Sequence, residues 1–475
     1  MNELSHKVES WVERGIISLR TARRILQAEG INAEEALQAR AGNRVVTVVA
    51  ILGAVLIGLG ALLFFASNWQ AIPVVGKIAI ILTSTAFAYG IGYWLKYIKD
   101  YAKIGQAVIL IGGILYGTGL FLVAQLFHTN ANPATLFLIW AAGLLPLVLL
   151  LADEWLMVLS TIVFAVWSLS RSFFDISIFR DFNPTANYPF LAILLLVVLP
   201  IIVYYRFRTA YAFALLAFLG WFGVANTVWH MNLENFEETI IVQVMLNYFF
   251  LGIALMLAGR LMRALPNGED FSFTTRFLGG AAFAVPTYIL SWNAVLFLWT
   301  EPPALTGVAL YVFWGLIVLV GLLLAAFFML RGTPEERRLT IREGGALAVF
   351  ALFGLIFALF PVDAGQSASQ AVMGGFGYGE TYFHPYVLPW NAVLLAFNIM
   401  LIVLGYFERR RLFVNLGLLF FLVHVISRYI DFFALEIPTS LAFIAGGVLL
   451  LVLAVALERF RWSLIIKMNT ESLPL

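Results

Sequence analysis

The chain contains no cysteine and few charged side chains, and these absences narrow its chemistry. Without cysteine, the protein has no disulfide, no thiolate metal site and no cysteine nucleophile. Charged residues make up only 12% of the 475 residues, whereas soluble domains carry about 25%. The net charge of +2 is small and no basic stripe follows the chain, so no nucleic-acid partner is expected.

Apolar residues take the place of the missing charges and indicate a membrane protein. They make up 62% of the chain, whose mean hydropathy is +0.93, whereas about 45–50% is usual for a soluble protein. A helix needs ~20 apolar residues to cross a bilayer. The sequence predicts an all-α polytopic transmembrane helix bundle of about 14 spans, near residues 45–66, 74–95, 104–127, 134–152, 155–170, 188–205, 209–229, 239–258, 277–299, 304–330, 344–361, 386–407, 412–427 and 437–457.

The positions of lysine and arginine predict the orientation, because cytoplasmic loops carry an excess of both. With the N-terminus in the cytoplasm, 25 of the 29 basic residues fall on the cytoplasmic side. No apolar run precedes the basic N-terminal region, so we expect no cleaved signal peptide. The chain is therefore expected to be a multi-pass inner-membrane protein with both termini in the cytoplasm. The four basic residues on the outer side are Lys77, Arg171, Arg180 and Arg428.

One connection departs from this pattern. Asp153 and Glu154 lie between the fourth and fifth predicted spans, on the side where basic residues are expected. If these two spans formed a re-entrant hairpin, the number of crossings would fall to twelve and every other loop would keep its side.

The chain begins with a segment that is not predicted to cross the membrane. Apolar residues recur at helical spacing from Leu4 to Val12, and Gly15 ends that helix. Residues 1–43 are expected to form a small cytoplasmic helical hairpin unit, which either packs and orients the protein or docks a cytoplasmic protein partner. The remaining boundaries are predicted as an N-terminal transmembrane domain over 44–152, the rest of the bundle over 153–467 and a cytoplasmic tail over 468–475.

Polar residues gather near the predicted outer ends of the first, third and thirteenth spans. Each needs a partner or a purpose, because polar groups are costly in a bilayer. One interpretation is structural, with Arg428 paired to Asp431; the other is a ligand-binding cavity that accepts a small molecule or lipid, such as an anion opposite Arg428. The predicted cluster comprises Asn68, Trp69, Gln125, His128, His424, Arg428 and Asp431.

Glycines four residues apart indicate close helix packing. Gly113 and Gly117 in the third predicted span allow the backbone of a neighbouring helix to approach.

Motifs for catalysis are missing. The sequence has no His-Glu-x-x-His metalloprotease pattern, no Gly-x-Ser-x-Gly elbow and no acidic residue in the first outer loop. No catalytic residue, metal site or cofactor is predicted. The favoured function is a transporter or flippase-like protein for a small or amphiphilic solute. The alternatives are a non-transporting scaffold that recruits a partner through residues 1–43 and, more weakly, a membrane-embedded envelope enzyme; membrane lipids are expected partners of each.

Several short segments resemble a known family. They are Glu9 to Ile17, Asn68-Trp69 at the end of the first span, and Ala124 to His128 followed by Trp140. Over about residues 1–150 the chain resembles the bacterial membrane-protein family built on domain of unknown function 2157, with a weaker resemblance from Asn415 to Arg461. The resemblance implies a bacterial membrane protein and no particular activity. The hallmarks that it implies are Asn68, Trp69, Gln125 and His128.

Overall fold

The computed structural model describes ten stretches of the chain. Contacts divide the chain into two units, Met1–Ser84 and Thr85–Leu475. The predicted N-terminal hairpin unit, the first predicted span and the C-terminal tail lie outside the described residues. The described stretches are 72–127, 132–173, 187–233, 239–263, 268–296, 314–321, 334–360, 385–408, 410–429 and 439–470.

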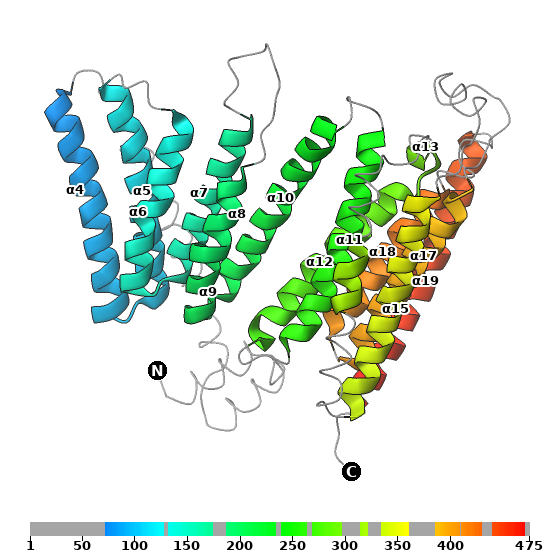
Figure 1. The fold of residues 1–475 in the computed structure, drawn as a ribbon. Helices are drawn as coiled ribbons and strands as arrows, with labels where there is room; N and C mark the ends of the chain where they lie inside the picture. Colours follow the sequence, from blue (N-terminus) through cyan, green and yellow to red (C-terminus); the bar gives the residue numbers. More distant parts are fainter. Residues whose placement is uncertain are drawn as a thin grey trace, which may run out of the picture. The chain divides into compact units, whose positions relative to one another are not determined.

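The described residues form helices and no strands (Figure 1), which confirms the all-α class. The bounds of the elements are α4 Val74–Tyr93, η2 Trp94–Ile98, α5 Ala102–Leu126, α6 Pro133–Leu151, α7 Glu154–Phe173, α8 Tyr188–Ile193, η3 Leu194–Val198, α9 Leu199–Tyr205, α10 Arg208–Leu233, α11 Thr239–Met262, α12 Glu269–Leu290, α13 Asn293–Leu296, α15 Pro334–Leu359, α17 Val387–Phe407, α18 Arg411–Tyr429 and α19 Thr439–Thr470.

Ten of the described helical segments are long and apolar enough to cross a membrane. Each overlaps one predicted span, and both α6 and α7 are among them, as the prediction of fourteen spans requires. The ten segments are Val74–Ile98, Ala102–Leu126, Pro133–Leu151, Glu154–Ser172, Tyr188–Tyr205, Arg208–Trp229, Ile240–Met262, Thr340–Leu359, Val387–Phe407 and Arg411–Tyr429.

The acidic connection between α6 and α7 has a structural explanation. Asp153 Oδ1 accepts the backbone N–H groups of Trp155 and Leu156, so it caps the start of α7. Its Oδ2 accepts a charged hydrogen bond of 2.6 Å from Lys96 Nζ. The neighbouring Glu154 accepts the backbone N–H of Thr209 and caps the start of α10. Both carboxylates thus satisfy helix ends, which explains why acidic residues occupy this connection.

A first apolar core joins α5, α6, α7, α9 and α10. Gly113 and Gly117 face side chains here, not the backbone of a neighbouring helix: a Cβ added to Gly117 would lie 2.0 Å from the Trp140 ring of α6. The same indole donates its Nε1–H to the Gly113 carbonyl at 3.0 Å. The absence of a side chain at Gly117 therefore leaves space for the Trp140 ring, and the Gly113 carbonyl accepts the hydrogen bond of its indole N–H.

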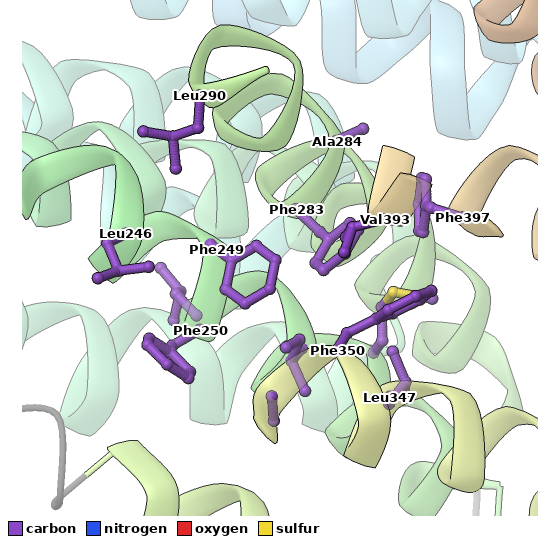
Figure 2. Close-up of a cluster of buried hydrophobic side chains, with 14 of the residues drawn as sticks. Leu246, Phe249, Phe250, Phe283, Ala284, Leu290, Leu347, Phe350, Val393 and Phe397 are labelled. Carbon is purple, nitrogen blue, oxygen red and sulfur yellow. The ribbon is translucent and has the colours of Figure 1, made fainter. Parts of the chain in front are cut away.

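A second apolar core lies among α11, α12, α15 and α17. Figure 2 shows Phe249, Phe283, Phe350 and Phe397 in this core, and the ring centroids of Phe283 and Phe397 are 4.6 Å apart. Helices α11 and α12 pack closely because a Cβ on Gly252 would lie 2.5 Å from the Phe283 backbone nitrogen.

Several of the described spans are irregular, including the span of α8 and α9 and that of α12. Pro200 lacks an N–H and cannot complete an ordinary helical turn, and the preceding turn widens to a π-helical one in which Leu199 N–H bonds to Leu194 O. The predicted span 277–299 is also interrupted, because α12 ends at Leu290 and the short α13 begins only at Asn293. The predicted start of this span, at residue 277, was wrong. Helix α12 begins at Glu269, so Arg276 lies two turns inside the helix and not in a loop before it.

Candidate functional site

A network of buried charges lies where α11, α12, α15 and α17 meet at one end of the bundle. We call this end the arginine end; it carries the end of α9 and the starts of α10, α12 and α18. The centre of the network is Arg276 of α12, whose side chain is 1% exposed. Its acidic partners are Glu343 of α15, 1% exposed, and Glu408 at the end of α17, 4% exposed. We call Arg260, Arg263, Arg276, Glu343 and Glu408 the buried ion network.

The guanidinium of Arg276 is shared between two carboxylates. Its Nη1 donates to both oxygens of Glu408, at 2.7 and 2.8 Å. Its Nη2 and Nε donate to Glu343 Oε1, at 2.9 and 3.1 Å. Multiple charge-assisted hydrogen bonds of this kind are the strong ones in proteins. Through this one side chain, α12 is joined to both α15 and α17.

Two arginines from the end of α11 complete the network. Arg260 donates to Glu408 Oε1 at 3.3 Å and to the Thr340 hydroxyl at 3.0 Å. Arg263 donates to Glu408 Oε2 at 3.0 Å and is 30% exposed. Three guanidinium groups therefore face two carboxylates, which leaves one positive charge in excess.

A glycine makes room for the central arginine. A Cβ on Gly259 of α11 would lie 2.6 Å from Arg276 Cγ and 2.9 Å from the Ser272 carbonyl oxygen. The Ser272 hydroxyl in turn donates to the Gly259 carbonyl at 2.6 Å. The network thus depends on close contact between α11 and α12.

Burial and ion pairing act in opposite directions on Glu408. Burial alone would raise the pKa of this carboxyl, but the guanidinium groups of Arg276 and Arg263 lower it below its ordinary value. The group is therefore held ionised. Buried ion pairs often add little net stability because desolvation offsets their attraction.

A pocket of about 570 Å³ opens beside the buried ion network. Arg263 and Glu408 belong to both, so the network forms one wall of the pocket. Arg410 adds a guanidinium that lies 4.6 Å over the ring of Phe273. The lining residues are Arg208, Arg263, Glu269, Asp270, Ser272, Phe273, Thr274, Glu408 and Arg410.

Sequence reasoning missed this site. It assigned the arginines to cytoplasmic loops as orientation signals and did not consider Glu343 or Glu408. The sequence did contain a signal: Glu343 lies within one apolar helix and Glu408 directly after another. A charge at such a position requires a buried partner of opposite charge.

At the opposite end of the bundle, Arg428 and His424 lie buried on α18. Arg428 Nη1 donates to the Ser291 carbonyl at 2.7 Å, and its Cζ lies 4.7 Å over the ring of Trp292. Asn391 Nδ2 donates to the same carbonyl at 3.1 Å. Ser291 is the C-terminal cap of α12, where the helix dipole is negative. Arg428 therefore contacts the C-terminal cap of α12, and whether it also binds a ligand stays a prediction.

The structure brings together only part of the predicted polar cluster. His424 and Arg428 share one face of α18, as their spacing predicted. Gln125 is an exposed residue near the end of α5, a helix that packs on α6 and α7. The remaining members, Asn68, Trp69, His128 and Asp431, lie outside the described residues, so the shared cluster stays a prediction.

Buried polar residues also line the antiparallel helices α12 and α17 between these two ends. On α12, Thr287 and Ser291 follow Arg276 on one face, and all three are buried. On α17, Asn398 is 0% exposed, and neither polar atom of its side chain has a hydrogen-bond partner among the described residues. Asn391 lies two turns away on the same face of α17.

The apolar helices and the charges buried among them define an all-α polytopic membrane protein. Residues 9–157 match the family described as "Predicted membrane protein (DUF2157)". This confirms the resemblance over the N-terminal part, while the weaker resemblance near the C-terminus lies outside the match. No curated protein and no solved structure matches the chain. The matched segment ends within α7, so the buried ion network lies beyond it.

Proposed function

We propose that the protein is a transporter or flippase-like protein for a small or amphiphilic solute. It resides in a bacterial inner membrane, with the arginine end and both termini in the cytoplasm. The observation that carries the proposal is the line of buried polar groups between α12 and α17.

These two helices touch through polar groups at both ends. At the arginine end, Arg276 of α12 bonds to Glu408 of α17 at 2.7 Å. At the opposite end, Asn391 of α17 bonds to the Ser291 carbonyl of α12 at 3.1 Å. Asn398 lies between them on α17. A buried amide without a partner costs free energy, and polar residues inside membrane bundles commonly mark substrate pathways.

Aromatic rings close this line in its middle. Phe283 of α12 and Phe397 of α17 meet at 4.6 Å between ring centroids, and Phe249 of α11 lies 4.7 Å from Phe283. If the protein transports a solute, this packed arrangement corresponds to a closed state. Passage of a solute requires α12 and α17 to separate at this contact.

The break between α12 and α13 supports the same proposal. Transporters frequently place an interrupted helix at the solute path, because its free backbone carbonyls bind polar groups. Here the Ser291 carbonyl at the break already accepts hydrogen bonds from Arg428 and Asn391.

The test is lipid and solute movement in proteoliposomes that contain the purified full chain. Fluorescent phospholipids report flipping through quenching by dithionite, and entrapped anions report solute transport. Asn398→Leu is expected to slow movement at least ~10-fold, because it removes the central polar group of the line. Its melting temperature should be retained, since the amide has no partner to lose.

The matched control is Asn415→Leu, the same chemical change at an exposed position of α18. Its transport rate should equal that of the unmodified protein. Unchanged movement in a well-folded Asn398→Leu variant, or no movement of any lipid or anion by the unmodified protein, would overturn the proposal.

A further inference from the structure

We infer that the pocket at the arginine end binds a phosphate group carried by an amphiphile such as an anionic phospholipid. The inference deepens the proposed function by naming the chemistry of its ligand. It rests on the pocket lining, the state of each charge in it and the neighbouring apolar surface.

Arg410 is the residue best placed to receive a phosphate. Its Cζ lies 4.6 Å over the Phe273 ring, and its guanidinium has no carboxylate partner among the described residues. An arginine stacked on an aromatic ring presents its donors in a fixed plane, which suits the paired oxygens of a phosphate. The hydroxyl-bearing residues Ser272 and Thr274 line the same pocket.

Two of the three acidic residues of the pocket lining are already engaged by other arginines. Glu408 is engaged by the three arginines of the buried ion network. Asp270 is engaged by Arg206 and Arg208. Glu269 is the remaining acidic residue of the lining.

The charges of the pocket and its ion-paired neighbours sum to an excess of positive charge. The five arginines of the pocket and the buried ion network, together with Arg206 that pairs with Asp270, face four acidic side chains, which leaves two positive charges over. Such an excess favours a bound anion such as the phosphodiester of a phospholipid. The arginines are Arg206, Arg208, Arg260, Arg263, Arg276 and Arg410, and the acids are Glu269, Asp270, Glu343 and Glu408.

The surroundings favour an amphiphile as the carrier of the phosphate. Phe407 and Leu412, which flank the connection that holds Arg410, are 41% and 47% exposed. They lie at the ends of two membrane-spanning helices. An acyl chain can therefore lie along these apolar side chains while the headgroup of the same lipid reaches the pocket. Basic pockets at the membrane boundary bind lipid headgroups in this way.

The experiment measures ligand binding by the full chain in detergent with native mass spectrometry. The probes are phosphatidylglycerol, diacylglycerol as the matched lipid without phosphate, and inorganic phosphate. Phosphatidylglycerol is expected to bind and diacylglycerol to be retained at least ~10-fold less. Arg410→Gln should weaken phosphatidylglycerol binding by about tenfold, because it removes one charge-assisted contact.

Arg461→Gln is the matched control, since Arg461 is an arginine of α19 that is bonded to Asn415 and paired with Glu458. It should bind as the unmodified protein does. In one outcome, inorganic phosphate competes with the lipid and its binding is lost in Arg410→Gln. That outcome supports the phosphate site and indicates that the natural ligand is a soluble phosphate compound and not a lipid. Equal binding of phosphatidylglycerol and diacylglycerol, or no effect of Arg410→Gln in a folded variant, overturns the inference.

The outcome is separable from that of the proposed function. Asn398→Leu lies away from the pocket and should keep phosphate binding while it loses transport. Binding without transport in the unmodified protein would sink the transport proposal and leave the phosphate site in place.

Discussion

Arg276 and Glu408 form a buried two-oxygen hydrogen bond, at 2.7 and 2.8 Å, across 132 residues of sequence. The pair joins the N-terminal half of α12 to the end of α17. It also sets the charge of the wall that the pocket shares with the buried ion network.

Removing Arg276 should destabilise the fold strongly. Arg276→Met leaves Glu343 and Glu408 without their main partner, and loss of one side of a buried ion pair costs about 3–5 kcal/mol. Adding Glu343→Gln to this variant should recover part of the loss. Thermal unfolding in detergent measures both, and Arg461→Met, at a half-exposed pair, should change stability by less than ~1 kcal/mol. A melting temperature of Arg276→Met equal to that of the unmodified protein would contradict the network.

Stability should depend on acidic pH through Glu408. The pKa of this carboxyl lies below its ordinary value of 4.5. A depressed pKa means that the ionised group stabilises the fold above the unfolded value and that this contribution disappears as pH falls through the folded value. The melting temperature should therefore fall below about pH 4.5 because of this group. Glu408→Gln should show a shallower fall over the same range; an unchanged slope would rule out this role.

Gly117 should not tolerate a side chain. A Cβ there would lie 2.0 Å from the Trp140 ring, and such overpacking costs about 1–3 kcal/mol. The control is Gly220→Ala in α10, where nothing lies within 4 Å of the added atom. The control should melt at or above the temperature of the unmodified protein, and Trp140→Leu should partly rescue Gly117→Ala.

Arg428 should matter for stability more than for transport. Arg428→Ala removes the donor to the Ser291 carbonyl and the charge at the end of α12, at a cost of about 1–2 kcal/mol. Arg428→Lys should keep the charge and part of the stability. His424→Leu, one turn away on the same face, should be close to neutral because His424 Nδ1 has no partner among the described residues. Loss of transport at full abundance and an unchanged melting temperature would instead indicate a functional arginine.

The proposed orientation can be tested by cysteine labelling, because the natural chain contains no cysteine. A single cysteine at Gly375, in a predicted outer loop, should react with a membrane-impermeant maleimide in intact cells. One at Thr333, in a predicted cytoplasmic loop, should react only after the membrane is opened. Labelling of Thr333→Cys in intact cells would reverse the orientation.

The sequence alone determined the class of protein and the position of most helices. The bilayer fixes the length of an apolar run, so the predicted span 188–205 coincides with the ends of α8 and α9. The glycine spacing marked a closely packed face of α5, but only the structure shows that the Trp140 side chain fills it. Such features depend on neighbours in the chain or on the solvent, and both can be read from a sequence.

Only the tertiary structure decided which helices meet. Arg276 and Glu343 are 67 residues apart, and no pattern in either segment announces the other. The sequence gives the depth of a side chain in the membrane, because depth follows from its place within a span. It does not give lateral position, because many arrangements of apolar helices bury similar surface and differ mainly in a few polar contacts. Those contacts, between Arg276 and Glu408 at one end and Arg428 and Ser291 at the other, select the arrangement and create the candidate site.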